Sequence, residues 1–271
     1  MKTFRVLTAL LLGIATLSGL RAQITIVSGS PGAFQVQLGT AYTQNFDSLP
    51  STGTSVTWTN NTTLHGWYAD ETSLLVSTGS STTGALYDFG SAASTDRALG
   101  SLASGGTDVV RYGIRLVNAT GITITSLAVS YDGEQWRRSD NNPQRAESLI
   151  FNYKIFAAGA GSVTSTGTWT TASSLDFTSP NGSSFTASAL DGNDPLNRQA
   201  GISLTLSGLN WLEGQELWIR WRDEDAAGTD HGLAIDNLSL TAIPEPSTYA
   251  LLVGLATLGL VAWRRRTLRT A

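Results

Sequence analysis

Acidic residues crowd one stretch late in the chain, and carboxylates at that density are the first candidates for chemistry. Asp223, Asp225 and Asp230 follow one another closely, and Asp236 comes six residues further on. Several hard oxygen ligands in one loop are what Ca²⁺ prefers in proteins. The spacing begins like a calcium-binding loop, but Ala227 occupies a ligand position, so the full pattern is not met. The sequence therefore leaves two interpretations open, a structural calcium site and a solvated acidic loop.

Catalysis needs a nucleophile with its base, or two carboxylates that act as acid and base. The chain has no cysteine and only two histidines, His65 and His231, and it contains neither a Gly-x-Ser-x-Gly nor a His-Glu-x-x-His motif. Asp132 and Glu134 would share one face of a strand, as the carboxylates of a glycan hydrolase can. Two acids in an acidic protein are weak evidence, so we expect no enzyme activity and keep an extracellular glycan hydrolase as an alternative. His231 is expected to serve as a loop ligand or a hydrogen-bond donor.

Aromatic and planar polar side chains gather after Tyr131. Glu134, Trp136 and Arg137 combine a ring that can cover an apolar sugar face with a carboxylate and a guanidinium that can bind hydroxyls. We interpret this stretch as a polar loop that reaches Glu147, and a carbohydrate-binding module is the first alternative for function. The competing interpretation is that the rings pack at the edge of the core while the arginines pair with nearby acids. Three further aromatic residues would extend such a surface: Trp58, Trp67 and Tyr68.

The charge of the chain excludes one class of ligand. Of the 17 basic and 21 acidic residues, seven bases but only one acid lie in the two terminal segments, which leaves 10 bases against 20 acids in residues 23–243. A surface with that balance repels phosphate, so no nucleic-acid partner is expected. Lys2 and Lys154 are the only lysines, which excludes a Gly-Lys-Ser/Thr phosphate loop.

The N-terminal segment has the three parts of a secretory signal peptide. Lys2 and Arg5 precede an apolar run at 6–20, and Ala22 supplies a small residue before a cleavage position. We therefore expect residues 1–22 to be a signal peptide, with an uncleaved N-terminal anchor as the alternative.

A second apolar run covers residues 247–263 and would be about 25 Å long as a helix, near the lower limit for crossing a bilayer core. Tyr249 and Trp263 stand near its ends, where amphipathic rings favour the membrane interface. The tail at 264–271 is rich in arginine, and positive flanks stay in the cytoplasm. The sequence predicts a single transmembrane helix at 247–263 with residues 23–243 outside the cell. The alternatives are an ordinary anchor and a buried core helix.

The order of these features resembles the PEP-CTERM sorting signal. Pro244, Glu245 and Pro246 precede the apolar run, and an arginine cluster ends the chain. The resemblance covers residues 244–271 and implies recognition by an exosortase of an exopolysaccharide-producing Gram-negative bacterium, with cleavage near Pro-Glu-Pro. We therefore expect an exported envelope protein with a structural or interaction role linked to exopolysaccharide, released or attached to the surface after processing. The arginines of the cluster are Arg264, Arg265, Arg266 and Arg269.

Residues 23–243 are predicted to form one all-β domain. Apolar residues recur at every second position in several stretches, and turns rich in Gly, Ser and Thr separate these stretches. No helical pattern is found in this part of the chain. Many short strands over this length predict an antiparallel β-sandwich of the jelly-roll type. The expected strands lie at 109–117, 122–131, 149–156, 202–206, 217–222 and 233–240, and the expected loops at 77–84, 158–168 and 179–189.

Three stretches of this domain resemble modules that recur on such exported proteins: 45–50, 131–137 and 230–240. The last is similar to the closing strand of lectin-like and MAM-like jelly rolls. In several such families the aspartate of that strand and an acid on an early strand hold a structural calcium ion. The resemblance therefore implies Asp236 and Asp47 as ligands of calcium, the one candidate cofactor.

Overall fold

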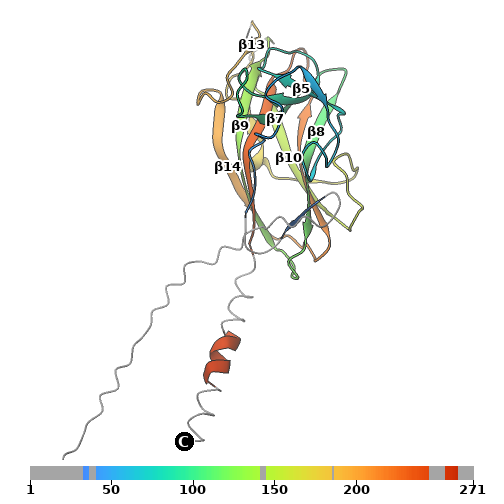
Figure 1. Cartoon of the computed structure of the whole chain (residues 1–271), viewed down its shortest axis with the longest axis vertical. Helices are drawn as coiled ribbons and strands as arrows, with labels where there is room; N and C mark the ends of the chain where they lie inside the picture. The colour runs from blue at the N-terminus through green and yellow to red at the C-terminus, as the bar shows by residue number, and fades with distance from the viewer. Residues whose placement is uncertain (1–32, 37–40, 141–144, 185, 244–253, 262–271) are drawn as a thin grey trace, which may run out of the picture.

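The computed structural model describes residues 33–36, 41–140, 145–184, 186–243 and 254–261, and over them the chain forms a sandwich of two β-sheets (Figure 1). The first sheet contains β1 (Phe34–Val36), β4 (Trp67–Ala69), β8 (Val109–Asn118), β10 (Ser148–Phe156), β11 (Thr170–Thr171), β12 (Phe177–Thr178) and β15 (Glu216–Glu224). The second contains β2 (Tyr42–Gln44), β3 (Ser55–Thr57), β5 (Ser73–Ser77), β6 (Ala85–Phe89), β7 (Ala98–Leu102), β9 (Ser126–Arg138), β13 (Ser188–Ala189), β14 (Arg198–Leu206) and β16 (Gly232–Ile243).

The strand order is that of a jelly roll. The first sheet carries the order β8-β15-β10-β11, and the second carries β7-β16-β9-β14, with every one of these neighbours antiparallel. From β7 to β10, and again from β14 to β16, each strand lies in the opposite sheet from the strand before it, as in the Greek-key connections of a jelly roll. The predicted fold class is confirmed, although two peripheral pairs, β1–β8 and β5–β6, are parallel.

Strand β9 extends further than the sequence indicates. It continues from Ser126 to Arg138, so the prediction of a polar loop that opens at Tyr131 was wrong. Glu134 pairs with Arg198 on β14 and with Ala234 on β16, so the polar half of β9 is bonded on both sides. Pairing on both sides gives the backbone N–H and C=O groups of this stretch their hydrogen-bond partners. This stabilises the strand although the stretch has few apolar residues. The expectation of no helix is confirmed for the described residues from 33 to 243, apart from one 3₁₀ turn at Ser173–Leu175.

The main core lies between the sheets and is centred on Trp221 of β15. Its ring is fully buried, stacks on Trp67 at 6.1 Å and on Tyr112 at 6.2 Å, and meets the edges of Tyr131 and Phe151 at 5.4 and 5.5 Å. Aromatic pairs in stacked and edge-on geometry stabilise a core beyond the area that they bury. This cluster fixes which face of each central strand points inward.

A smaller apolar cluster covers the outer side of the second sheet. Tyr87 stacks on Phe89 at 4.7 Å, and Phe89 stacks on Trp136 at 6.1 Å. A Cβ placed on Gly192 would lie 2.4 Å from the Trp136 ring, so the loop that carries Gly192 packs directly on that ring. This loop explains why Trp136 is buried although it points away from the main core.

Gly133 of β9 marks a position where the core has no room for a side chain. A Cβ there would lie 2.2 Å from the ring of Phe177, which is itself buried. We expect Gly133→Ala to lower the free energy of unfolding by about 1–3 kcal/mol, because the ring must shift inside a packed core. Urea unfolding checks this, with Gly106→Ala as the control because its nearest neighbour lies 3.7 Å away. Equal stability of Gly133→Ala and the wild type would contradict the packing described here.

The predicted terminal segments lie largely outside the described residues. This applies to the signal peptide at 1–22, to the Pro-Glu-Pro motif and to the arginine tail. Of the predicted transmembrane segment, residues 254–261 are described and are helical. Among the described helices, none has the length and the apolar character needed to span a membrane.

Candidate functional site

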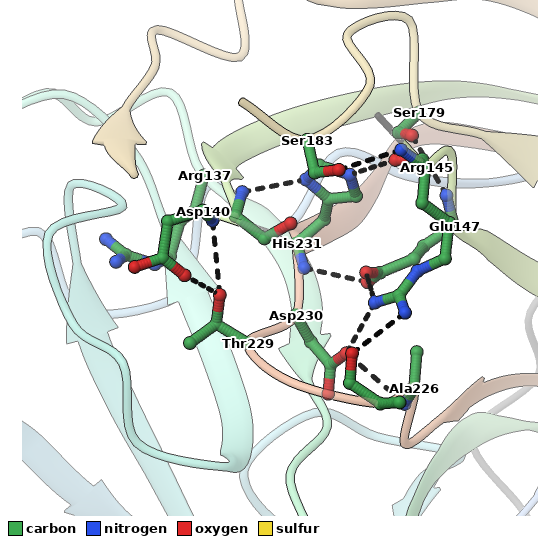
Figure 2. Close-up of polar contacts among 12 residues, drawn as sticks. Arg137, Asp140, Arg145, Glu147, Ser179, Ser183, Ala226, Thr229, Asp230 and His231 are labelled. Carbon is green, nitrogen blue, oxygen red and sulfur yellow. Dashed lines mark hydrogen bonds and ion pairs between the residues drawn. The ribbon is translucent and has the colours of Figure 1, made fainter. Parts of the chain in front are cut away.

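A buried polar network joins the end of β15 to the start of β16 (Figure 2). Arg145 lies at its centre, with Nη2 2.6 Å from Oε1 of Glu147 and 3.5 Å from Oδ1 of Asp230. Oε2 of Glu147 accepts a hydrogen bond from the backbone N–H of His231 at 2.7 Å. Oδ1 of Asp230 accepts one from the backbone N–H of Ala226 at 3.2 Å, so the network ties the 225–231 loop to the sandwich.

His231 is a structural residue of this network. The backbone N–H of Ser139 donates to its Nδ1 at 3.1 Å, so Nδ1 must be an acceptor. Its Nε2 then carries the proton and donates to the carbonyl oxygen of Arg145 at 3.0 Å. The ring is fully buried and both nitrogens are engaged, which confirms the prediction of a hydrogen-bond donor.

Ionisation of the carboxyl groups around this network is unfavourable, because they are buried close to one another. Asp223 and Asp230 are 1% and 2% exposed, and Oδ2 of each lacks a hydrogen-bond partner. Burial raises the pKa of Asp230 to about 8, and the charges of Glu147 and Asp223 add to the rise. Burial likewise raises the pKa of Asp223 to about 7, with Glu147 and Asp225 as further contributors. These groups therefore exchange protons near neutral pH.

The five predicted calcium ligands fall into two separate groups. Asp223, Asp225 and Asp230 influence one another's charge at the end of β15 and in the loop that follows, whereas Asp236 lies on β16 and is influenced by Asp47. Asp47 accepts a hydrogen bond from the backbone N–H of Arg97 at 3.2 Å, and Oδ1 of Asp236 is buried without a partner. Over the described part of the chain, no three acidic or histidine side chains are arranged to hold a metal ion. Calcium binding by these aspartates therefore stays a prediction.

Asp132 and Glu134, the carboxylates considered for glycan hydrolysis, differ sharply in environment. Glu134 is 1% exposed and accepts a hydrogen bond from Nε1 of Trp136 at 2.9 Å. Burial raises the pKa of Glu134 to about 8, and the charge of Asp236 adds to the rise. Burial opposes ionisation of Asp132 too, but the N–H of Gly201 and the Arg198 guanidinium hold the pKa of this carboxyl below its usual value.

The residues predicted to bind sugar do not share a surface. Tyr131 points into the main core, where its hydroxyl donates to the carbonyl oxygen of Leu175. Trp136 lies in the smaller cluster on the other side of the sheet, beside Glu134. Arg137 is buried and donates to the carbonyl oxygen of Gly79 at 3.2 Å. Of the three aromatic residues expected to extend this surface, Trp58 and Trp67 are buried and Tyr68 is partly exposed.

Sequence reasoning missed a second polar surface, the outer side of the first sheet. On β15 the inward residues alternate with Trp218, Arg220 and Arg222, which face outward opposite β8 and β10. The ring of Tyr68 packs 4.8 Å from that of Trp218, and the Arg220 guanidinium lies 3.7 Å from the ring centre of Trp169. The period-two pattern of β15 indicates which of its residues face outward. Their neighbours on β8 and β10 follow only from the strand pairing in the structure.

Comparison with known proteins assigns the C-terminus. The PEP-CTERM protein-sorting motif matches residues 242–266. This chain carries a PEP-CTERM sorting motif. The motif begins at Ala242, the second-last residue of β16, so the sorting signal follows the sandwich without a spacer. No curated protein matches the PEP-CTERM chain at the level of sequence.

Three solved structures are similar to the sandwich of this PEP-CTERM protein. TmCBM61, solved in complex with β-1,4-galactotriose, is 7% identical with a TM-score of 0.29, covering 65% of this chain and 88% of its own. The N-terminal cellulose-binding domain of Cellulomonas fimi β-1,4-glucanase C is 15% identical with a TM-score of 0.32, covering 66% and 90%. The CBM22-1 xylan-binding domain of Paenibacillus barcinonensis Xyn10C is 13% identical with a TM-score of 0.28, covering 75% and 94%. The jelly-roll assignment itself follows from the strand order.

Proposed function

We propose that this protein is exported and that its PEP-CTERM motif delivers it to an exosortase. The β-sandwich then acts as a non-catalytic structural or interaction component of the cell surface, linked to exopolysaccharide. The observation that carries the proposal is the match of the sorting motif to residues 242–266, directly behind the last strand of the sandwich. An extracellular domain held by such a signal is oriented outward by the arginines of its tail.

The anchor before processing is proposed to be the apolar segment at 247–263. Its described part, residues 254–261, is helical, and Leu255, Leu258 and Leu260 are exposed. A bilayer would cover these side chains, and their exposure otherwise has an unfavourable hydration free energy. The helix is proposed to hold the sandwich at the membrane until the motif is cut.

A non-catalytic role is supported by the groups that catalysis would need. Glu134 is buried against Trp136, so a substrate cannot reach its carboxyl group while the covering loop is in place. His231 uses both ring nitrogens to hold backbone groups. A general acid or base must lie within hydrogen-bond reach of a substrate atom, and neither side chain meets that condition.

Carbohydrate binding is the second candidate function. It is favoured by the rings and guanidinium groups on the outer side of the first sheet, because planar polar groups beside aromatic rings suit sugar recognition.

Sorting is tested by replacing Pro244, Glu245 and Pro246 together with alanine in a host that encodes an exosortase. We expect the wild type to leave the inner-membrane fraction only when the exosortase gene is intact, and the triple variant to remain there in both cases. Immunoblotting of membrane and surface fractions measures this, with Leu196→Ala as the control because that side chain is exposed on the sandwich. Release of the triple variant at the wild-type level would contradict exosortase sorting.

A further inference from the structure

We propose that the outer side of the first sheet binds acidic polysaccharide, with uronate-bearing chains as the ligand class. The inference rests on the proposed link to exopolysaccharide and names the polymer class and the surface. We call this surface the basic face and define it by the outward cations of β8, β10 and β15. They are Arg111, Arg115, Lys154, Arg220 and Arg222.

The basic face concentrates the positive charge of an acidic domain. It holds five of the 10 basic residues found in residues 23–243. Three carboxylates pair with its cations: Asp70 with Arg111, Glu216 with Arg115, and Glu224 with Arg222. The other two cations, Lys154 and Arg220, form no ion pair with a described residue, so positive charge is left on this face of an acidic domain. Such a separation of charge directs an anionic polymer to one side of the molecule.

Like charges are crowded together on this face. Arg222 lies directly opposite Arg111 across the β8–β15 ladder, and Arg220 is two residues away on the same strand. Burial, together with the charges of Arg222 and Arg111, lowers the pKa of the Arg220 guanidinium to about 10. Like charges that face each other across a sheet destabilise it. Asp70 and Glu224 offset part of this repulsion, and a bound anion would offset more of it.

Arg220 is the buried cation of this group. Its side chain is buried, its Nη1 donates to the carbonyl oxygen of Val163 at 2.7 Å, and its Nε has no partner. The ring of Trp169 covers the guanidinium at 3.7 Å, which fixes the plane of the group. Arg220 therefore adds positive potential to the basic face from beneath Trp169, and the partly exposed cations make the direct contacts with the polymer.

Aromatic rings lie among the cations. Phe156 lies 4.9 Å from the ammonium of Lys154 and 5.8 Å from the ring of Trp169, and all three side chains are partly exposed. Tyr68, also partly exposed, packs beside Trp218 at the far side of the face. Sugar rings present apolar faces to such aromatic groups, whereas their carboxylates pair with arginine or lysine.

The spacing of the cations favours a polyuronate over a nucleic acid. The backbone positions that carry these cations are about 4.8 Å apart on neighbouring strands and about 7 Å apart two residues along one strand. Duplex DNA carries one charge per about 1.7 Å of axis and would bring its phosphates against the acidic remainder of the domain. A polymer with one carboxylate per sugar unit can place its charges on the basic face alone.

Lysine labelling gives a direct test, because Lys154 is the only lysine in residues 23–243. The full-length chain in mild detergent is treated with an amine-reactive ester, with and without polygalacturonate, and acylation of Lys154 is quantified by peptide mass spectrometry. We expect polygalacturonate to slow acylation at Lys154, while neutral dextran leaves the rate unchanged. Equal rates with and without polygalacturonate would overturn the assignment.

Variants that each remove one positive charge test whether binding depends on the basic face or on charge elsewhere in the molecule. We expect Arg222→Gln and Lys154→Gln each to weaken polygalacturonate binding by about threefold to tenfold, since one exposed charge contact contributes about 1 kcal/mol. Arg138→Gln removes the same charge from the end of β9 in the second sheet and is expected to bind as the wild type does.

The outcomes of these experiments distinguish failure of the basic-face proposal from failure of the proposed function. Polygalacturonate binding that is equal in all three variants would overturn the basic face but leave a polysaccharide-linked role intact. Protection of Lys154 by single-stranded DNA or by anionic vesicles at the same concentration would overturn the polysaccharide assignment and indicate attraction by charge alone. Failure of sorting in the Pro-Glu-Pro experiment would overturn the proposed export route whatever this face binds.

Discussion

Replacing Trp221 with alanine is expected to remove about 3–5 kcal/mol from the free energy of unfolding, which is a large share of the stability of an ordinary domain. The ring is fully buried and contacts four other aromatic rings, two by stacking and two by their edges. Alanine would leave a cavity lined by rigid groups that cannot collapse into it. The lost van der Waals contacts add to the hydrophobic free energy that burial of the ring contributes.

Urea unfolding followed by far-UV circular dichroism measures this effect. Trp169→Ala is the matched control, because that tryptophan is partly exposed on the outer side of the first sheet. We expect the control to lose less than half as much stability as Trp221→Ala. Similar losses in the two variants would show that the core is not centred on Trp221.

Lowering the pH from 8 to 5 is expected to stabilise the sandwich by at least about 3 kcal/mol, which one carboxyl group with a folded pKa near 8 would contribute alone. Burial raises the pKa of Glu134 and of Asp230 to about 8, and that of Asp223 and of Asp236 to about 7. In the unfolded chain such groups titrate near 4. Between these values the folded state holds protons that the unfolded state does not, so stability falls as pH rises, by up to about 1.4 kcal/mol per pH unit for each group.

The sign of this dependence is specific to these buried carboxyl groups. Asp132 and Glu216 have a lowered pKa and contribute the opposite slope, but only in the acidic range below their unfolded values. Urea unfolding at pH 5, 6, 7 and 8 gives the slope, and Glu134→Gln should reduce it because it removes one titrating group. Asp194→Asn, on an exposed loop away from these carboxyl groups, serves as the control. Stability that rises from pH 5 to pH 8 would contradict the burial of unpaired carboxyl groups.

The sequence predicted the sheets better than the faces of their strands. Period-two patterns located β8, β10, β14, β15 and β16, because alternation reports directly which side of a strand is buried. The polar half of β9 was missed for the same reason. Its second face carries Glu134 and Trp136, which a small second cluster and a covering loop bury, so both faces are inside and the alternation vanishes.

The candidate sites were harder to predict, because they depend on neighbours that are distant in the sequence. Asp47 contributes to the electrostatic environment of Asp236, whereas the acids from 223 to 230 form a different group. Arg145, which pairs with Asp230, is 85 positions away from it, and no local pattern predicts that contact. The basic face likewise arises from three strands whose order only the register reveals.

Intact-mass spectrometry of the mature protein, isolated from the envelope of its native host, tests exosortase sorting most directly. We expect a mass that ends near Pro244, with the apolar segment and the arginine tail removed, and a full-length C-terminus in a strain without exosortase. A mature protein that retains Arg264 to Ala271 in the presence of an active exosortase would contradict the proposed function.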